Sequence, residues 1–232
     1  MGKDVIIACD FDSREKLMSF LDNFSEEKPF LKIGMELFYA LGPDVVREIK
    51  DRGHKIFLDL KLHDIPNTVK KAMAVLSGLG VDMVNVHAAG TKAIMEAAIE
   101  GLTRPDGTRP MLIAVTQLTS TSEERMQNEL LISASLPDTV TKYAQNACDA
   151  GLDGVVCSPL EAEMVHNACG KGFVTVTPGI RFADSASDDQ VRITTPAKAK
   201  EIGSDYIVVG RPITASQDPA AAYKRCCDEF IG

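Results

Sequence analysis

The chain has too little positive charge for a nucleic-acid-binding surface. It carries 25 Lys and Arg against 33 Asp and Glu, and its formal net charge is -8. Proteins that bind polynucleotides need a concentrated excess of cations to displace the counterions condensed on the phosphates. The sequence therefore predicts no nucleic-acid partner, although a small anion needs only a local positive pocket.

Long apolar segments are missing as well. No run reaches the roughly 20 apolar residues that a transmembrane helix requires. The N-terminal stretch MGKDVIIACDFD has a short apolar run that soon turns acidic, and it lacks the length and the cleavage site of a signal peptide. We therefore expect a cytoplasmic protein without a membrane partner.

The 6 cysteines show neither a CxxC pair nor the spacing of metal ligands, so we expect reduced, structural thiols and no metal site. Low-complexity tracts are also absent, and 45% of the residues are hydrophobic. This composition excludes disordered, collagen-like and solenoid architectures. A chain of 232 residues can bury one sizeable core, so we expect a single domain spanning 1–232.

Short apolar, β-branched runs alternate with amphipathic, helical patterns along the whole chain. The predicted strands are 5–9, 30–33, 55–60, 82–87, 111–116, 154–158, 173–177 and 206–210. The predicted helices are 13–23, 43–52, 66–79, 91–103, 138–150, 160–169, 196–202 and 218–230. Eight strand and helix pairs favour an α/β fold closed as a (β/α)8 TIM barrel. An open, doubly wound sheet is less favoured because no GxGxxG turn follows the first strand.

Charged residues gather where the first three predicted strands end. They are Asp10, Lys32, Asp59, Lys61 and Asp64. In a (β/α)8 barrel the carboxyl ends of the strands form the active site, and consecutive strands are neighbours. Asp59 and Lys61 are two apart, so the period of a strand directs both to one face. The sequence thus predicts a patch of alternating charges at the barrel mouth, although buried ion pairs can also be purely structural.

The last two strands are followed by features suited to a phosphate. Residues 178–195 are rich in Gly, Pro, Asp and Ser and form a long connection, which is typical of a mobile loop that closes over a ligand. After the eighth strand, Gly210 allows close approach of an anion and Arg211 offers a bidentate guanidinium. Pro212 can begin a short helix there.

The run from Asp59 to Thr68, DLKLHDIPNT, resembles the DxKxxDIPxT signature of orotidine 5'-monophosphate decarboxylases. Further similar segments lie along the chain: ACDFD at 8–12, LKIG at 31–34, TQLTS at 116–120, TPGIR at 177–181, DDQVR at 188–192 and VVGRPIT at 208–214. The chain is similar to the compact, monofunctional bacterial members. The resemblance implies conversion of orotidine 5'-monophosphate (OMP) to UMP and CO2 in de novo pyrimidine biosynthesis, without a cofactor.

The same resemblance implies a role for each matching residue. Lys61 would protonate C6 of the pyrimidine within a catalytic set that also holds Asp59, Asp64 and Lys32. A homodimer is implied in which Asp64, Ile65 and Thr68 reach the partner's site. The residues implied to bind substrate are Asp10, Lys32, Asp59, Ile65, Thr68, Thr119, Pro178, Arg181, Gln190, Gly210 and Arg211.

Two alternatives remain open at the level of sequence. A magnesium-dependent sugar-phosphate decarboxylase or aldolase could use Asp59 and Asp64 as oxygen ligands, but the ammonium of Lys32 would repel a divalent cation. A catalytically inactive barrel could bind a nucleotide as a sensor. The intact set of Asp59, Lys61 and Asp64 disfavours that reading.

Overall fold

The computed structural model describes residues 3–184 and 194–232. Its strands form a closed barrel in the order β1-β2-β3-β4-β5-β6-β7-β8, with parallel pairing throughout and β1 also paired to β8. The strands are β1 Asp4–Ala8, β2 Phe30–Gly34, β3 Ile56–Leu62, β4 Met83–His87, β5 Met111–Val115, β6 Gly154–Val156, β7 Val174–Thr177 and β8 Tyr206–Val209. The predicted (β/α)8 TIM barrel is therefore confirmed, and the open sheet is wrong.

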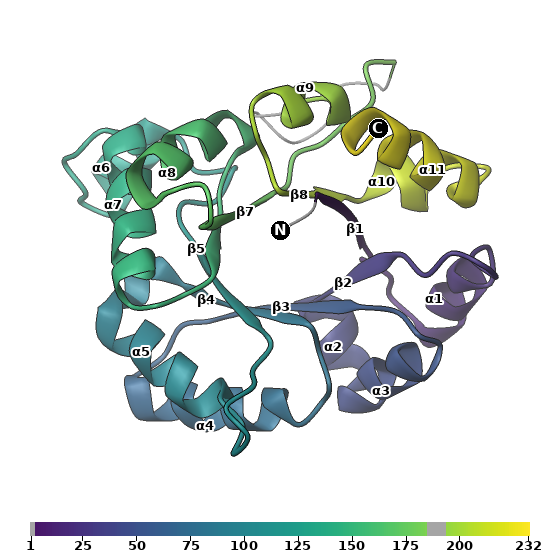
Figure 1. Ribbon diagram of the computed structural model, residues 1–232, viewed down its shortest axis with the longest axis horizontal. Helices are drawn as coiled ribbons and strands as arrows, with labels where there is room; N and C mark the ends of the chain where they lie inside the picture. Colours follow the sequence, from purple (N-terminus) through teal and green to yellow (C-terminus); the bar gives the residue numbers. More distant parts are fainter. Residues whose placement is uncertain (1–2, 185–193) are drawn as a thin grey trace.

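The helices surround the barrel in chain order (Figure 1). They are α1 Arg14–Leu21, α2 Met35–Leu41, α3 Pro43–Asp51, α4 Pro66–Ser77, α5 Thr91–Leu102, α6 Glu123–Glu129, α7 Leu136–Asp149, α8 Ala162–Cys169, α9 Pro196–Glu201, α10 Arg211–Thr214 and α11 Pro219–Phe230. Short 3-10 turns, η1 Ala88–Gly90 and η2 Pro159–Glu161, follow β4 and β6. No helix in the described ranges is long and apolar enough to span a membrane.

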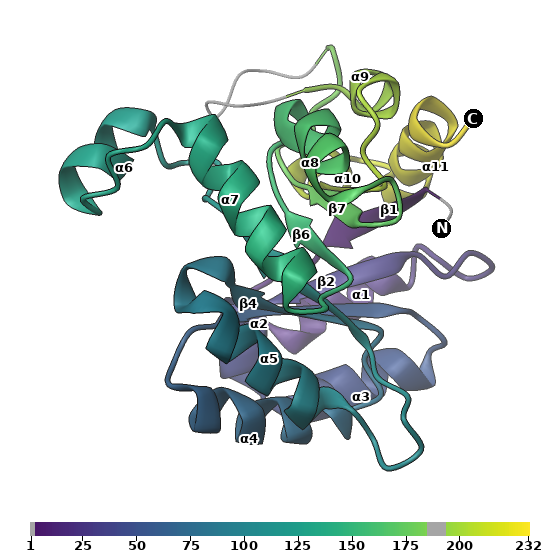
Figure 2. The same cartoon turned by 60° about the vertical axis from the view of Figure 1, so that its left-hand side comes forward.

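Several helices begin at the predicted residues, as α4 does at 66 and α9 at 196. Pro66 occupies the first turn of α4, and the Thr195 side chain accepts a hydrogen bond from the backbone N–H of Lys198 at the start of α9. Both features satisfy the requirements of a helix N-terminus, where backbone N–H groups lack intrahelical partners. Helices α2 and α6 were not predicted. In Figure 2, α6 projects away from the barrel wall.

Alternation along the strands produces two cores. Residues such as Ile7, Leu31 and Leu58 face the surrounding helices and belong to the larger apolar cluster. The intervening residues, among them Ile6, Phe30 and Phe57, fill the barrel interior. Because side chains of a strand alternate between faces, the next inward positions after Phe30 and Phe57 are charged residues near the strand ends.

The carboxyl end of β3 departs from regular strand geometry. Leu58 pairs with Val84 and Leu62 with Val86, so four residue steps of β3 lie opposite two of β4. Lys61 has a φ of 51°, in the left-handed region that an L-residue adopts at a cost of about 1 to 2 kcal/mol. The bulge occurs within the charged run, and strain of this kind persists only where surrounding contacts impose it.

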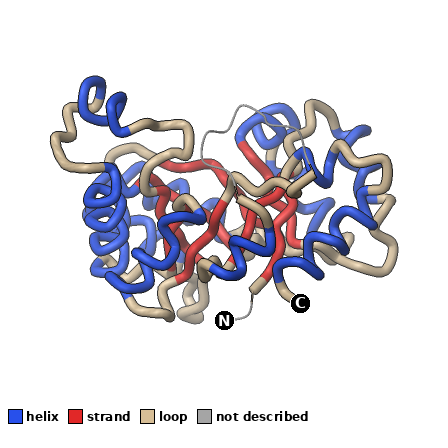
Figure 3. The backbone as a smooth tube through the Cα atoms, turned by 90° about the horizontal axis from the view of Figure 1, so that it is seen from above, coloured by secondary structure: helices blue, strands red, loops and turns tan. Residues whose placement is uncertain are grey.

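The two ends of the barrel differ in what they carry. Because the strands are parallel, all of them finish at the same end of the barrel, and Figure 3 shows the strands enclosed by helices with the C-terminus near the opposite end. The loops that follow the strands therefore share one mouth, and this mouth holds the site.

Candidate active site

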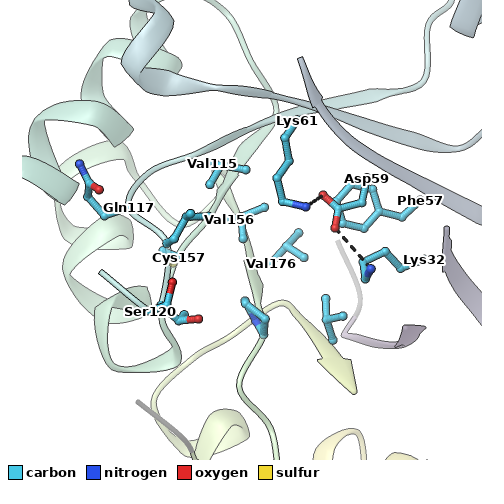
Figure 4. A pocket seen from close by; sticks show the side chains of 14 residues that line it. Lys32, Phe57, Asp59, Lys61, Val115, Gln117, Ser120, Val156, Cys157 and Val176 are labelled. Carbon is cyan, nitrogen blue, oxygen red and sulfur yellow. Dashed lines mark ion pairs between the residues drawn. The ribbon is translucent and has the colours of Figure 1, made fainter. Parts of the chain in front are cut away.

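Two lysines flank one carboxylate at the barrel mouth (Figure 4). Lys61 Nζ lies 2.7 Å from Asp59 Oδ1, and Lys32 Nζ lies 3.4 Å from Asp59 Oδ2. Lys32 Nζ also lies 3.1 Å from Asp10 Oδ1. The structure thus brings together four of the five charged residues predicted to form the patch, in an alternating row that runs from β1 through β2 to β3.

The row fixes the charge state of its buried members. Burial by itself would raise the pKa of Asp59, but the ammonium groups of Lys32 and Lys61 and the hydrogen bonds to the carboxylate outweigh it and lower this pKa from its ordinary value. Burial would likewise lower the pKa of Lys32, yet Asp59 and Asp10 raise it. Asp59 is therefore held as a carboxylate and Lys32 as an ammonium.

Asn85 on β4 forms the back of this centre. Its side-chain N–H donates to Asp59 Oδ1 at 2.6 Å, and its side-chain oxygen accepts the backbone N–H of Lys61 at 2.8 Å. Asn85 is 1% exposed. The sequence does not reveal the role of this residue, because its partners on β3 become known only with the pairing register of the two strands.

Gly34, at the end of β2, was also missed. A Cβ there would lie 3.3 Å from Asp10 Oδ1 and 3.3 Å from Lys32 Nζ. Its φ of -87° is open to any residue, so the constraint at this position is space for the ion pair and not backbone conformation. The LKIG segment contained the only sequence signal for it.

A cavity of about 210 Å³ opens beside the charged row. Lys32, Asp59 and Lys61 line one side of it, and Figure 4 shows the Lys61 and Asp59 side chains meeting at this edge. Apolar side chains from several strands form much of the remaining wall, including Val115, Val156, Val176 and Val208. Polar groups come from the segment after β5, namely Gln117, Thr119 and Ser120. The predicted contact residue Thr119 therefore lies at this cavity.

A second hollow of about 440 Å³ adjoins the first, with which it shares Lys32, Pro178 and Val208. Its lining also includes Asp10, Arg181, Gly210 and Arg211, so all the predicted phosphate residues in the described ranges lie together. The predicted short helix after β8 is confirmed as α10, with Gly210 at its N-cap. Two guanidinium groups beside a glycine backbone suit a phosphate.

The segment after β3 does not join the row within this chain. Asp64, Ile65 and Thr68 are exposed, and 66% of Ile65 is accessible. Asp64 accepts a hydrogen bond from the backbone N–H of Ile65 at 2.6 Å and has no ion-pair partner within the described residues. The fifth member of the predicted patch thus lies outside the charged row of its own subunit.

The connection after β7 is described only in part. Thr194 forms a parallel bridge with Ile180. Its N–H donates to Gly179 O, and its carbonyl accepts from the Arg181 N–H at 2.9 Å. Gln190, and with it residues 185–193 of the predicted closing loop 178–195, lies outside the described residues.

The donor chemistry of the centre does not suit a divalent cation. Both oxygens of Asp59 already face ammonium groups, and a cation between them would meet two like charges. No group of three or more His, Cys, Asp or Glu in the described part of the chain is arranged as a metal site.

The closed parallel barrel carries a row of lysines and carboxylates at its mouth and an adjoining hollow lined by two arginines. These features define the class: a (β/α)8-barrel protein whose mouth suits a phosphorylated anion. A family model described as orotidine 5'-phosphate decarboxylase / HUMPS family matches residues 3–226. The chain belongs to this family.

Named relatives cover nearly the whole chain. The orotidine 5'-phosphate decarboxylase of Streptococcus mutans is 59% identical over 98% of this chain and 97% of its own length. That of Listeria monocytogenes is 58% identical over 97% of both chains. The crystal structure of the enzyme so named from Lactobacillus acidophilus has a TM-score of 0.89 and 43% identity, covering 99% of this chain and 100% of that one.

Proposed function

We propose that this chain catalyses the decarboxylation of OMP to UMP and CO2 as a step of de novo pyrimidine biosynthesis. The observation that carries the proposal is the row of Lys32, Asp59 and Lys61 on the wall of a cavity that continues into the arginine pocket. Family membership and the names of full-length relatives support the same substrate.

The two hollows divide the substrate into two parts. The smaller cavity, largely apolar with Thr119 at its edge, accepts the pyrimidine, and the hollow with Arg181, Gly210 and Arg211 accepts the phosphate. Lys32 borders both, so the ribose lies at the junction beside the Asp10 and Lys32 pair. Contacts with the distant phosphate contribute by holding the reacting carbon against Lys61.

The reaction needs a fixed cation at C6. Loss of CO2 leaves an electron pair in an sp2 orbital in the plane of the ring, where the π system cannot delocalise it. An ammonium beside C6 stabilises this charge without solvent reorganisation and then donates the proton that replaces CO2. Lys61 performs both tasks, and Asp59 at 2.7 Å fixes its Nζ at the edge of the cavity.

We propose that the active protein is a homodimer in which Asp64, Ile65 and Thr68 enter the partner's site. Their exposure directly after β3 supports this arrangement, because exposed side chains are free to contact a second subunit. Asp64 would then bring a second carboxylate to the partner's Lys61. Four further points stay predictions: the one-domain organisation, the contact of Gln190 with substrate, closure of the 178–195 loop and a cytoplasmic location.

The test is turnover of OMP by the purified protein in the presence of EDTA, followed by the change in ultraviolet absorbance. We expect formation of UMP at the same rate with and without EDTA. Absence of turnover by folded protein would refute the proposal, and magnesium-dependent turnover of a sugar phosphate would favour the metal-dependent alternative.

A further inference from the structure

A buried amide lies between the two parts of β3 that the proposed reaction depends on. Asn85 donates to the Asp59 carboxylate at 2.6 Å and accepts from the Lys61 backbone at 2.8 Å. The two contacts fix the orientation of the amide, since a backbone N–H requires the oxygen and a carboxylate requires the nitrogen. Asn85 is 1% exposed and does not line the cavity in the described part of the chain.

The contact with Lys61 compensates for the bulge in β3. Regular pairing between β3 and β4 is interrupted between Leu58 and Leu62, and Lys61 takes a φ of 51°. A backbone N–H displaced from the ladder would be unsatisfied, and the Asn85 oxygen accepts it. The direction in which the Lys61 side chain leaves the strand therefore depends on this hydrogen bond.

The contact with Asp59 orients the carboxylate between its two cations. Asp59 Oδ1 receives both Asn85 Nδ2 at 2.6 Å and Lys61 Nζ at 2.7 Å, whereas Oδ2 faces Lys32 Nζ at 3.4 Å. A donor on Oδ1 limits rotation of the carboxylate, so the Lys61 ammonium is held at one place on the cavity wall.

We propose that Asn85 is a positioning residue, which holds the Asp59 carboxylate and the left-handed Lys61 backbone in the geometry that places the ammonium at the reacting carbon. The inference rests on the proposed decarboxylation. It predicts that Asn85 affects the chemical step far more than the binding of substrate, because the arginine pocket lies apart from it.

Three substitutions test the two contacts. Asn85→Asp keeps an acceptor for the Lys61 N–H but places a second anion against Asp59, Asn85→Ala removes both contacts, and Asn85→Ser replaces the amide by a shorter side chain with one hydroxyl. The matched control is Thr116→Val on the neighbouring region after β5. Thr116 is 3% exposed and donates to Val156 O at 2.9 Å without touching the charged row, so the control also loses one buried hydrogen bond near a strand end.

The measurements are kcat, KM and the pH profile for OMP, with circular dichroism as the test of folding. We expect Asn85→Asp to lower kcat about 100-fold, since a small displacement of reacting groups has that effect, while KM changes by less than about threefold. Asn85→Ala should show a smaller loss of kcat than Asn85→Asp, and Asn85→Ser a smaller loss than Asn85→Ala. Thr116→Val should retain the wild-type kcat.

The pH profile gives a readout that a purely structural role would not move. The charged groups facing Asp59 are Lys32 from β2 and Lys61 from β3. His87 on β4 is a further titratable group that interacts with Asp59. Loss of the amide donor, or a second anion in its place, raises the pKa of Asp59, so the acidic limb should move to higher pH by about one unit in Asn85→Asp.

The outcomes are distinguishable. If the wild-type protein does not convert OMP, the proposed function fails. If the wild type is active and the Asn85 variants match Thr116→Val in kcat and acidic limb, the positioning role is refuted. It is also refuted if all three Asn85 variants fail to fold while Thr116→Val folds, because Asn85 would then serve stability alone.

Discussion

Replacement of Lys61 by alanine is the most direct perturbation of the proposed chemistry. The side chain is 25% exposed, its Nζ lies 2.7 Å from Asp59 Oδ1, and it lines the cavity. At an effective dielectric constant of about 20, an ammonium about 3.5 Å from a developing unit charge contributes about 5 kcal/mol, or about 3,000-fold in rate. Loss of a positioned proton donor adds about 100-fold or more. We therefore expect Lys61→Ala to lower kcat/KM by at least about 10⁵-fold.

The assay is the absorbance change on conversion of OMP, with EDTA present and enzyme concentration raised until slow turnover is measurable. Lys71→Ala is the matched control, since Lys71 is an exposed lysine on the adjacent helix α4. The control should keep wild-type activity. A folded Lys61→Ala protein with more than about one hundredth of wild-type kcat/KM would refute the reasoning, because neither the electrostatic nor the proton-transfer effect could then be assigned to this residue.

Three further predictions test the other parts of the site. Gly34→Ala should lower kcat about 10-fold with little loss of thermal stability, because its Cβ would meet a carboxylate and an ammonium at 3.3 Å each and the neighbours must shift by a few tenths of an ångström; an unchanged kcat would contradict the close fit. Arg211→Ala should raise KM for OMP about 100-fold through loss of a guanidinium in the phosphate hollow, and equal KM values for variant and wild type would remove the phosphate from this place. Equal mixtures of inactive Lys61→Ala and Asp64→Ala proteins, refolded together, should recover about a quarter of wild-type activity. Half of the dimers are then mixed, and each mixed dimer has one intact site of its two. No recovery would show that both residues act within one subunit.

The fold followed closely from local patterns. Each predicted strand agrees with an observed strand to within a few residues at either end, as for 206–210 against Tyr206–Val209. Alternation of apolar residues and helix-start signals such as Pro66 and Thr195 are short-range features, and they survive in the folded chain because the barrel repeats one local unit. Helices α2 and α6 were missed because each is only one short element inserted between a strand and its covering helix.

The site was predicted in composition and only partly in geometry. Asp59 and Lys61 share the cavity as expected, but they do so around a bulge and not through regular alternation. Asn85 could not be recognised, because an asparagine on β4 becomes important only when the register sets it against the Asp59 carboxylate.

The sequence by itself determined the number and order of the strand and helix units and the kind of charge at each strand end, since both depend on residues close together in the chain. The tertiary structure alone decided which oxygen meets which ammonium, where the bulge lies and how the cavity joins the hollow lined by Arg181 and Arg211. Those features depend on register between distant segments, such as the pairing of Asp4 with Tyr206 that closes the barrel. Barrel closure brings the first and last strands together and so places Asp10 beside Arg211 at one hollow, a relation that no local pattern contains.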